Sequence, residues 1–294
     1  MAEEVRASCQ RDRARTHLRA VAVGEGTLSG GLPFLAIGAG PPVVVFPGLG
    51  PRHANPTGME RRFQLRQWAP LAAHFTVFVV NRKPGLRPGS TIADFAEHYA
   101  GAIGAEFSPP VHVVGISTGG SIAQQFAIDH PLLVRRLVLL ATACRLSPHG
   151  RAVQRAQAAL ILAGRPRQAG AVVGPTLAAT RVGGGLMAAL MWSFGHAMAA
   201  ADPSDMIATI NAEDTFDASS DLHRITAPTL LVAGARDRYY SPELFWETAA
   251  RIPNARLRLN ARMGHAGVVS SPLAHCEIVR FLTAEGVAET RANQ

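Results

Sequence analysis

A chain of 294 residues, 48% of them hydrophobic, can bury a substantial core, either as one large domain or as two small ones. Its formal net charge of +8 comes almost entirely from arginine, because Lys83 is the only lysine. Arginines crowd the first 19 residues, and elsewhere basic residues are scattered without interleaved aromatic residues. Specific nucleic-acid binding is therefore not expected.

The cysteines and the apolar segments bear on the compartment. Cys9, Cys144 and Cys276 are too few and too scattered for a disulfide framework, and no Cys-x-x-Cys pair indicates a zinc or redox site. The N-terminus lacks the apolar core of a signal peptide, so we expect a cytoplasmic protein. Residues 182–201 carry no formal charge over about the length of a membrane span, but four glycines, Ser193 and His196 favour a buried or pocket-lining helix.

The first third of the chain predicts strands that lead to a glycine-rich loop. Residues 1–16 form a basic lead-in that we expect to be mobile. Apolar runs at 17–23 and 32–37 predict two strands joined by a turn across 24–31. Residues 43–46 are apolar on both faces, as a central parallel strand is. Pro47-Gly48-Leu49-Gly50 follows directly, where open α/β sheets bind ligands.

Strands and helices then alternate. Residues 59–74 predict an amphipathic helix, 75–80 a strand, 81–89 a Pro/Gly-rich loop, and Ser90 or Thr91 can cap a helix that runs to about 105. A strand over 111–114, a helix over 121–130 and a strand over 137–141 follow. Such alternation predicts an α/β fold with a doubly wound, mostly parallel sheet.

Residues 144–223 break this rhythm. No strand is evident there, and helical apolar spacing recurs at 152–163 and 186–198. Alternation resumes with a strand over 229–233, a helix over 242–251, an edge strand over 256–259 and a helix over 271–283. We therefore expect one core built from residues 17–143 and 224–294, with a helical insertion between them.

The segment 111–120 contains the motif Gly-x-Ser-x-Gly, centred on Ser117. A serine on a tight strand-to-helix turn needs small neighbours two residues away on each side, which Gly115 and Gly119 supply. The following helix would aim its free N–H groups at the oxygen that becomes negative during acyl transfer. Ser117 is thus the candidate nucleophile, although a glycine-rich loop that merely caps a helix has the same pattern.

Two further polar residues follow late strands. Asp237 lies in Gly-Ala-Arg-Asp-Arg after the strand at 229–233, and His265 lies in Met-Gly-His-Ala-Gly after the strand ending near 259. The order Ser117, Asp237, His265 is that of the α/β-hydrolase triad. On these residues the chain resembles the α/β-hydrolase superfamily over about residues 18–282, with the insertion at the position of that family's cap.

The chemistry requires each residue type. A neutral imidazole can take the proton of the Ser117 hydroxyl and return it to the leaving group, which is the role expected for His265. Asp237 would hold the imidazole tautomer and offset the imidazolium charge. Arg236 and Arg238 would favour its ionised form, unless they simply face solvent. The resemblance implies an oxyanion hole formed by the backbone N–H groups of Leu49 and Thr118.

Each partner has competitors. Asp237 could instead cap the next helix, and Asp214, Asp217 and Asp221 are alternative acids, although they lie at the end of the insertion. His112, His130 and His275 read as strand or helix residues. The superfamily often has His-Gly where this chain has Pro47-Gly48, which removes a side chain that usually steadies the loop, and an aspartate where it has Asn81. A serine nucleophile argues against dehalogenase and epoxide hydrolase chemistry.

The resulting hypothesis is a serine hydrolase that cleaves a carboxylic ester or related small acyl substrate. Apolar residues of the insertion would cover the site and favour a hydrophobic substrate: Leu160, Ile161, Leu162, Leu186, Met187, Leu190, Met191, Trp192 and Phe194. Cofactor-free haloperoxidase or perhydrolase activity, C–C bond hydrolysis and a non-catalytic ligand-binding role are the alternatives. No motif indicates a metal or organic cofactor. The oligomeric state is not predicted.

Overall fold

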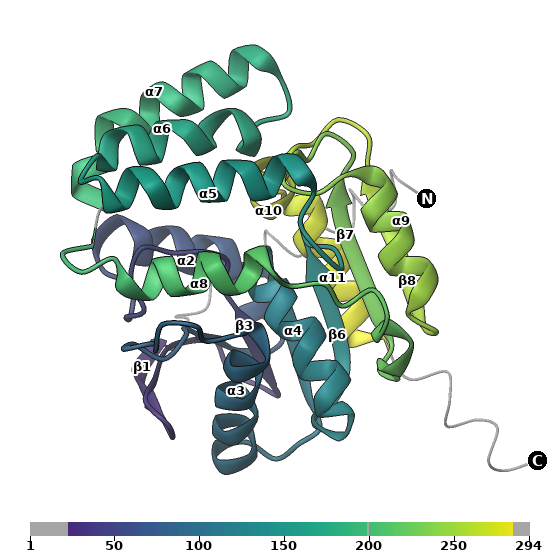
Figure 1. The fold of residues 1–294 in the computed structure, drawn as a ribbon. Helices are drawn as coiled ribbons and strands as arrows, with labels where there is room; N and C mark the ends of the chain where they lie inside the picture. The colour runs from purple at the N-terminus through teal and green to yellow at the C-terminus, as the bar shows by residue number, and fades with distance from the viewer. Residues whose placement is uncertain (1–22, 199, 285–294) are drawn as a thin grey trace, which may run out of the picture.

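The computed structural model describes residues 23–198 and 200–284, in which eight strands form one sheet ordered β1-β2-β4-β3-β5-β6-β7-β8 (Figure 1). The strands β1 and β2 pair antiparallel, as do β2 and β4, and all other neighbours are parallel. This arrangement confirms the mostly parallel, doubly wound sheet. The strands are β1 (Val23–Leu28), β2 (Leu32–Ile37), β3 (Pro42–Phe46), β4 (Thr76–Val80), β5 (Val111–Ile116), β6 (Val134–Leu140), β7 (Thr229–Gly234) and β8 (Ala255–Asn260).

Helices cover both faces of the sheet, because the central strands are apolar on both sides. In β3, Val43 and Val45 belong to the core layer that includes α2 (Gly58–Ala72) and α11 (Pro272–Thr283). Val44 and Phe46 point the other way, into the layer of α3 (Ile92–Glu106), α4 (Thr118–Asp129) and α9 (Pro242–Arg251). The carboxyl ends of the parallel strands are therefore left for the loops that carry polar residues.

Local signals set the starts of these helices. Thr91, one of the two predicted caps, accepts a hydrogen bond from the N–H of Asp94, whose carboxylate accepts the N–H of Thr91 in return. Ser241 and Ser271 cap α9 and α11 through their side chains alone, accepting the N–H groups of Leu244 and Ala274, and each is followed by a proline at the first helical position.

Four helices separate β6 from β7 and form the insertion: α5 (Pro148–Leu162), α6 (Pro166–Leu177), α7 (Arg181–Met198) and α8 (Ser204–Asp214). Figure 1 shows α5, α6 and α7 stacked beyond the end of the sheet, with α8 between them and the core. The described residues of this segment contain no strand. All four helices lie within 144–223; these bounds, and those of the two core segments, stay a prediction.

Several element limits differ from the prediction. β1 begins at Val23 and runs through Gly24 and Gly26, so the turn is confined to residues 29–31; the remainder of the run at 17–23 and the lead-in 1–16 lie outside the described residues. A short helix, α10 (His265–Val269), and two 3-10 turns, η1 (Pro131–Leu133) and η2 (Leu222–Arg224), were not predicted. α4 begins at Thr118 rather than Ser121, because Ser117 itself is the turn.

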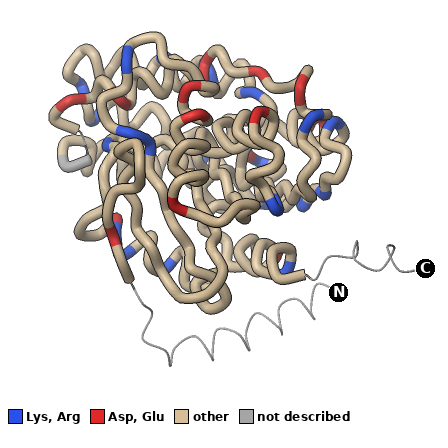
Figure 2. The backbone as a smooth tube through the Cα atoms, turned by 90° about the horizontal axis from the view of Figure 1, so that it is seen from below, with Lys and Arg blue, Asp and Glu red and all other residues tan. Residues whose placement is uncertain are grey.

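The distribution of charge and the lengths of the helices bear on two expectations, and the expectation of no specific nucleic-acid binding stays a prediction. In Figure 2, basic and acidic positions are interspersed along the backbone. Among the described residues, no helix is both long and apolar enough to cross a membrane. Cys144 is buried with a free thiol, and the cytoplasmic location stays a prediction.

Candidate active site

Ser117 sits on a strained turn between β5 and α4. Its φ of 50° and ψ of −123° are rare for a residue with a β-carbon, and such strain concentrates at functional sites. The neighbouring glycines are required by space: a β-carbon on Gly115 would lie 2.6 Å from that of Ala123, and one on Gly119 would lie 2.1 Å from the Phe46 carbonyl oxygen. The motif is thus a closely packed elbow and not a loose loop.

Asp237 and His265 form a buried pair. The His265 Nδ1 and the Asp237 Oδ2 are 2.7 Å apart, and the two side chains are 7% and 0% exposed. The other carboxylate oxygen of Asp237 accepts the backbone N–H groups of Tyr239 and Tyr240, at 2.9 and 3.2 Å. With Nδ1 donating to the carboxylate, Nε2 of His265 is left as a proton acceptor.

Of the two alternatives left open for Arg236 and Arg238, support of the Asp237 carboxylate or exposure to solvent, the structure favours exposure. Arg236 and Arg238 are exposed, and neither pairs with Asp237. Arg238 instead donates to the Pro175 carbonyl oxygen of the insertion, at 3.4 Å. Backbone N–H groups thus satisfy the carboxylate, which a loop can supply without placing a second buried charge beside it.

The loop after β3 is held from beneath by Arg82. This side chain is only 1% exposed, and its guanidinium donates to the carbonyl oxygens of Pro47 and Gly48, at 3.0 and 3.1 Å. A β-carbon on Gly48 would lie 3.4 Å from that of Ser117, so the loop passes against the elbow. Arg82 therefore steadies a loop that lacks the histidine common in the superfamily.

Ser117, His265 and Leu49 line one cavity of about 710 Å³. Asp237 lies behind His265, and Thr118, fully buried at the first position of α4, lies beneath the elbow. The structure therefore brings all five predicted site residues to one region. It does not bring Asp214, Asp217 or Asp221 there: each is paired with an arginine, respectively Arg155, Arg145 and Arg224.

A family model described as the alpha/beta hydrolase family matches residues 43–277, which is most of the chain. The chain belongs to the alpha/beta hydrolase family. RutD of Caulobacter vibrioides, whose name marks carbamate hydrolysis as its proposed activity, is 30% identical over 199 residues, covering 67% of this hydrolase and 74% of the relative. The pimeloyl-(acyl-carrier protein) methyl ester esterase of Neisseria meningitidis is 27% identical over 215 residues, covering 69% and 67%.

Solved structures agree with this assignment. A hydrolase from Pseudomonas aeruginosa PA01 superimposes on this hydrolase with a TM-score of 0.68 at 25% identity, covering 90% of this chain and all of that one. BpoC of Mycobacterium tuberculosis, whose name marks non-heme bromoperoxidase as its proposed activity, gives a TM-score of 0.69 at 23% identity, covering 87% of this chain and 97% of that one. The second likeness concerns the fold alone.

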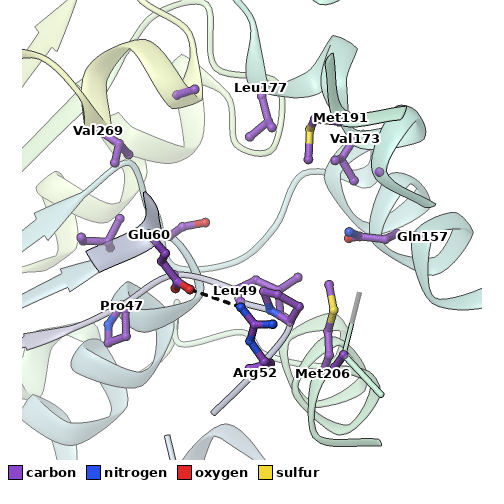
Figure 3. Close-up of a pocket in the computed structure, with 18 of the residues that line it drawn as sticks. Pro47, Leu49, Arg52, Glu60, Gln157, Val173, Leu177, Met191, Met206 and Val269 are labelled. Carbon is purple, nitrogen blue, oxygen red and sulfur yellow. Dashed lines mark ion pairs between the residues drawn. The ribbon is translucent and has the colours of Figure 1, made fainter. Parts of the chain in front are cut away.

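The cavity of this hydrolase is mainly apolar and lies between the core and the insertion (Figure 3). Val173, Leu177 and Met191 line it from α6 and α7, and Met206 lines it from α8. The polar exceptions include Gln157 and the half-exposed pair of Arg52 and Glu60, whose charged groups are 3.7 Å apart. Such a cavity accommodates an organic substrate with a substantial hydrocarbon part.

Most of the insertion residues predicted to cover the site do not line it. Ile161 and Met191 do, but Leu162, Leu186, Leu190, Trp192 and Phe194 are exposed. The reason is the packing of α7, which turns glycines toward α6 and its large side chains outward. The charge-free stretch at 182–201 contains most of α7, which lines the cavity with one side and exposes the other. Of the two predicted alternatives, buried or pocket-lining, the structure supports the second.

Sequence reasoning missed a buried carboxylate behind the elbow, that of Glu213 at the end of α8. It is 1% exposed and accepts hydrogen bonds from four side chains: Thr118 Oγ1 at 2.6 Å, Gln154 Nε2 at 2.9 Å, Ser121 Oγ at 3.2 Å and Tyr240 Oη at 3.2 Å. These donors come from the elbow helix, the insertion and the Asp237 loop. Glu213 thus connects the insertion to the elbow and the Asp237 loop through hydrogen bonds. No local sequence motif predicts this role.

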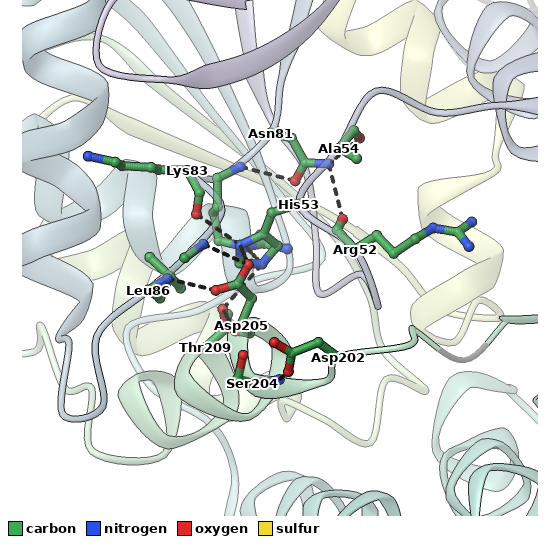
Figure 4. Close-up of polar contacts among 12 residues, drawn as sticks. Arg52, His53, Ala54, Asn81, Lys83, Leu86, Asp202, Ser204, Asp205 and Thr209 are labelled. Carbon is green, nitrogen blue, oxygen red and sulfur yellow. Dashed lines mark hydrogen bonds and ion pairs between the residues drawn. The ribbon is translucent and has the colours of Figure 1, made fainter.

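A second polar cluster anchors α8 near the Arg82 loop (Figure 4). The Asp205 carboxylate accepts the backbone N–H groups of Gly85 and Leu86, at 3.0 and 2.7 Å. His53 accepts from Arg82 Nε through Nε2 at 3.0 Å, and its Nδ1 lies 3.1 Å from the Lys83 carbonyl oxygen. Burial, followed by the charge of Arg82, lowers the pKa of His53 to about 4, so this histidine is neutral near pH 7.

Proposed function

We propose that this hydrolase cleaves a carboxylic ester or related acyl substrate through an acyl-enzyme on Ser117. His265 Nε2 takes the hydroxyl proton as Ser117 Oγ attacks the carbonyl carbon, and then delivers it to the leaving alcohol. Water attacks the ester of Ser117 in the second half, again with His265 as base, and releases the carboxylic acid and the free serine. Asp237 stays ionised and offsets the imidazolium charge.

The observation that carries the proposal is the meeting of Ser117 and the His265–Asp237 pair at one cavity. The N–H groups of Thr118 and Leu49 are the proposed oxyanion donors, because Thr118 opens α4 and Leu49 lies on the loop packed against the elbow. The largely apolar lining favours a substrate with a hydrophobic acyl or alcohol part. The similarity to a methyl ester esterase supports ester cleavage within this class.

The test is turnover of a panel of p-nitrophenyl esters of increasing acyl length by the wild type, Ser117→Ala and His265→Gln. Both variants should lose at least about 10³-fold in kcat. His130→Gln, which changes a surface histidine paired with Glu97, is the control and should keep wild-type turnover. Equal turnover by wild type and Ser117→Ala would exclude the proposed nucleophile.

Labelling by an active-site fluorophosphonate separates catalysis from a non-catalytic binding role. The wild type should be labelled once, at Ser117, and Ser117→Ala should not be labelled. Labelling at Ser117 without ester turnover would favour the alternative activities, perhydrolysis or C–C bond hydrolysis, over ester cleavage. Failure of the folded wild type to react would favour a ligand-binding protein on a hydrolase frame.

A further inference from the structure

The outermost helix of the insertion, α7, exposes large apolar side chains along one line. Val182, Leu186, Leu190 and Phe194 recur at every fourth position and are 77%, 69%, 52% and 46% exposed. Between them the exposed positions are Gly185, Ala189, Trp192 and Ser193, so no charge interrupts the line. We call Val182, Leu186, Leu190 and Phe194 the α7 stripe. An apolar surface this continuous usually marks an interaction site.

The inner face of α7 explains why these residues point outward. A β-carbon on Gly174 of α6 would lie 2.4 Å from the backbone nitrogen of Ala188, and one on Gly195 would lie 2.6 Å from the Cα of Arg167. α6 and α7 thus meet backbone to backbone through small residues, as helices do in an apolar environment. The hairpin buries Gly174, Gly184 and Gly195 and leaves the large apolar residues of the stripe exposed, which is the reverse of an ordinary surface helix.

Charge narrows the identity of the partner. Residues 148–201 contain five arginines and no aspartate or glutamate. Arg151 and Arg155 lie on α5, and Arg155 pairs with Asp214 of α8. Arg165, Arg167 and Arg181 are exposed beside or between α6 and α7, and none of them pairs with a carboxylate in the described part of the chain. The Arg167 guanidinium lies 4.8 Å from the centre of the exposed Trp192 ring.

From these observations we infer that the α6–α7 hairpin docks on an anionic lipid surface, with the α7 stripe buried among the acyl chains. Exposed leucine, phenylalanine and tryptophan beside uncompensated arginine is the combination that binds a helix parallel to such a surface. α7 is the element farthest from the sheet in Figure 1, so a plane can approach it. Met191 and Gly195 of the same helix line the cavity, so docking would place the cavity wall beside lipid.

A second copy of the chain is a poorer partner for the same face. Face-to-face pairing through α7 would bring two sets of unpaired arginines together without a carboxylate between them, which opposes association. A lipid surface rich in phosphate diesters supplies both the apolar interior and the negative charge. Docking needs no chemistry at Ser117, so its test is independent of the proposed reaction.

The test is co-sedimentation of the full-length protein with vesicles. Phosphatidylcholine vesicles containing about one third phosphatidylglycerol should bind the wild type and Ser117→Ala alike, and pure phosphatidylcholine vesicles should bind both much more weakly. Raising the salt concentration should weaken binding to the anionic vesicles. Arg165→Gln should lower the partition coefficient on anionic vesicles by about five-fold, and Arg181→Gln should do the same.

Replacement of the stripe residues tests whether the α7 stripe is the surface that contacts the lipid. Leu186→Glu/Leu190→Glu should lower the partition coefficient at least about ten-fold, and Leu186→Gln/Leu190→Gln should lower it without a change of charge. The matched control is Leu132→Glu/Trp246→Glu, which makes the same charge change at two exposed apolar residues outside the insertion. Their side chains are 88% and 59% exposed. All these positions are exposed, so circular dichroism melting should confirm that each variant folds.

Three results would overturn the inference. Wild-type protein that stays in the supernatant with anionic vesicles would exclude docking altogether. Equal loss of binding in the stripe variant and the control would show attraction by net charge alone. A wild type that is dimeric in solution, ignores vesicles and becomes monomeric in Leu186→Glu/Leu190→Glu would assign the stripe to self-association.

Discussion

At the scale of single residues, two buried charged side chains organise the proposed site, Arg82 from beneath the Leu49 loop and Glu213 from behind the elbow. Neither is a member of the triad. Arg82 donates to the carbonyl oxygen of Gly48, which belongs to the same peptide group as the N–H of Leu49, and Glu213 accepts the hydroxyl of Thr118. We regard both as positioning residues.

Arg82→Met should lower kcat for ester hydrolysis by about 10- to 100-fold with a smaller change in KM. The loop would lose two charge-assisted hydrogen bonds, and a displaced donor at an oxyanion hole weakens transition-state binding more than substrate binding. The matched control is Arg87→Met, in the same loop segment but exposed, which should keep wild-type kinetics. An unchanged kcat in a folded Arg82→Met protein would contradict the positioning role.

Glu213→Gln should lower the free energy of unfolding by about 1–3 kcal/mol, because an amide cannot accept from four donors at once and leaves buried groups unpaired. Asp214→Asn is the neighbouring control: its salt bridge is with the largely exposed Arg155, so its loss should change the free energy of unfolding much less. Denaturant titration measures the free energy of unfolding of both variants. Equal losses would contradict the inference that the four buried hydrogen bonds of Glu213 stabilise the fold more than the Asp214 salt bridge does.

At the scale of elements, glycines decide how closely the helices approach the sheet and one another. At Gly119 a β-carbon would meet the carbonyl of Phe46 in β3, whereas at Gly104 of α3 it would meet nothing within 4 Å. The same residue type thus has opposite meanings in α4 and in α3. In α4 it is required by close approach, and in α3 it only weakens the helix.

Gly119→Ala should therefore abolish folding or lower the free energy of unfolding by more than about 3 kcal/mol, through overpacking at the elbow. Gly104→Ala should raise it by about 0.5–1 kcal/mol, since alanine is the better helix former. Thermal unfolding of the two variants should shift in opposite directions. A stabilised Gly119→Ala protein would show that the elbow can move away from β3.

At the scale of the whole molecule, burial of neutral histidines couples stability to pH. His53 lies between the β3 loop and α8, and His112 lies in β5 near Phe75. Burial, followed in each case by nearby arginine charge, lowers the pKa of both to about 4. Both must acquire a proton on unfolding at mildly acidic pH, so acid favours the unfolded chain.

The free energy of unfolding should accordingly be highest above pH 6.5 and fall as the pH drops from about 6.5 to 4. Each buried histidine can contribute up to about 3 kcal/mol to this loss, because the unfolded state binds a proton that the folded state excludes. Denaturant titrations across this range measure the slope. His112→Val should reduce it, and identical slopes in variant and wild type would exclude His112 as a source.

The sequence by itself determined the sheet class and the three proposed triad residues, and the family resemblance added Leu49 and Thr118. Strand and helix periods are local, and Gly-x-Ser-x-Gly followed by an acid and a histidine after later strands is readable in chain order. Element limits such as the start of β1 at Val23 were less certain, because Gly24 and Gly26 signal a turn unless a partner strand is known.

Only the tertiary structure decided which residues support the site and which way the insertion faces. Arg82 and Glu213 lie far in sequence from the groups they hold, so no spacing rule links them. The outward turn of the α7 stripe depends on glycine contacts between α6 and α7, which a helical period cannot reveal. Hydrophobic periodicity shows that one face of a helix is apolar. Whether that face is buried or exposed depends on which face of the helix packs against its neighbour.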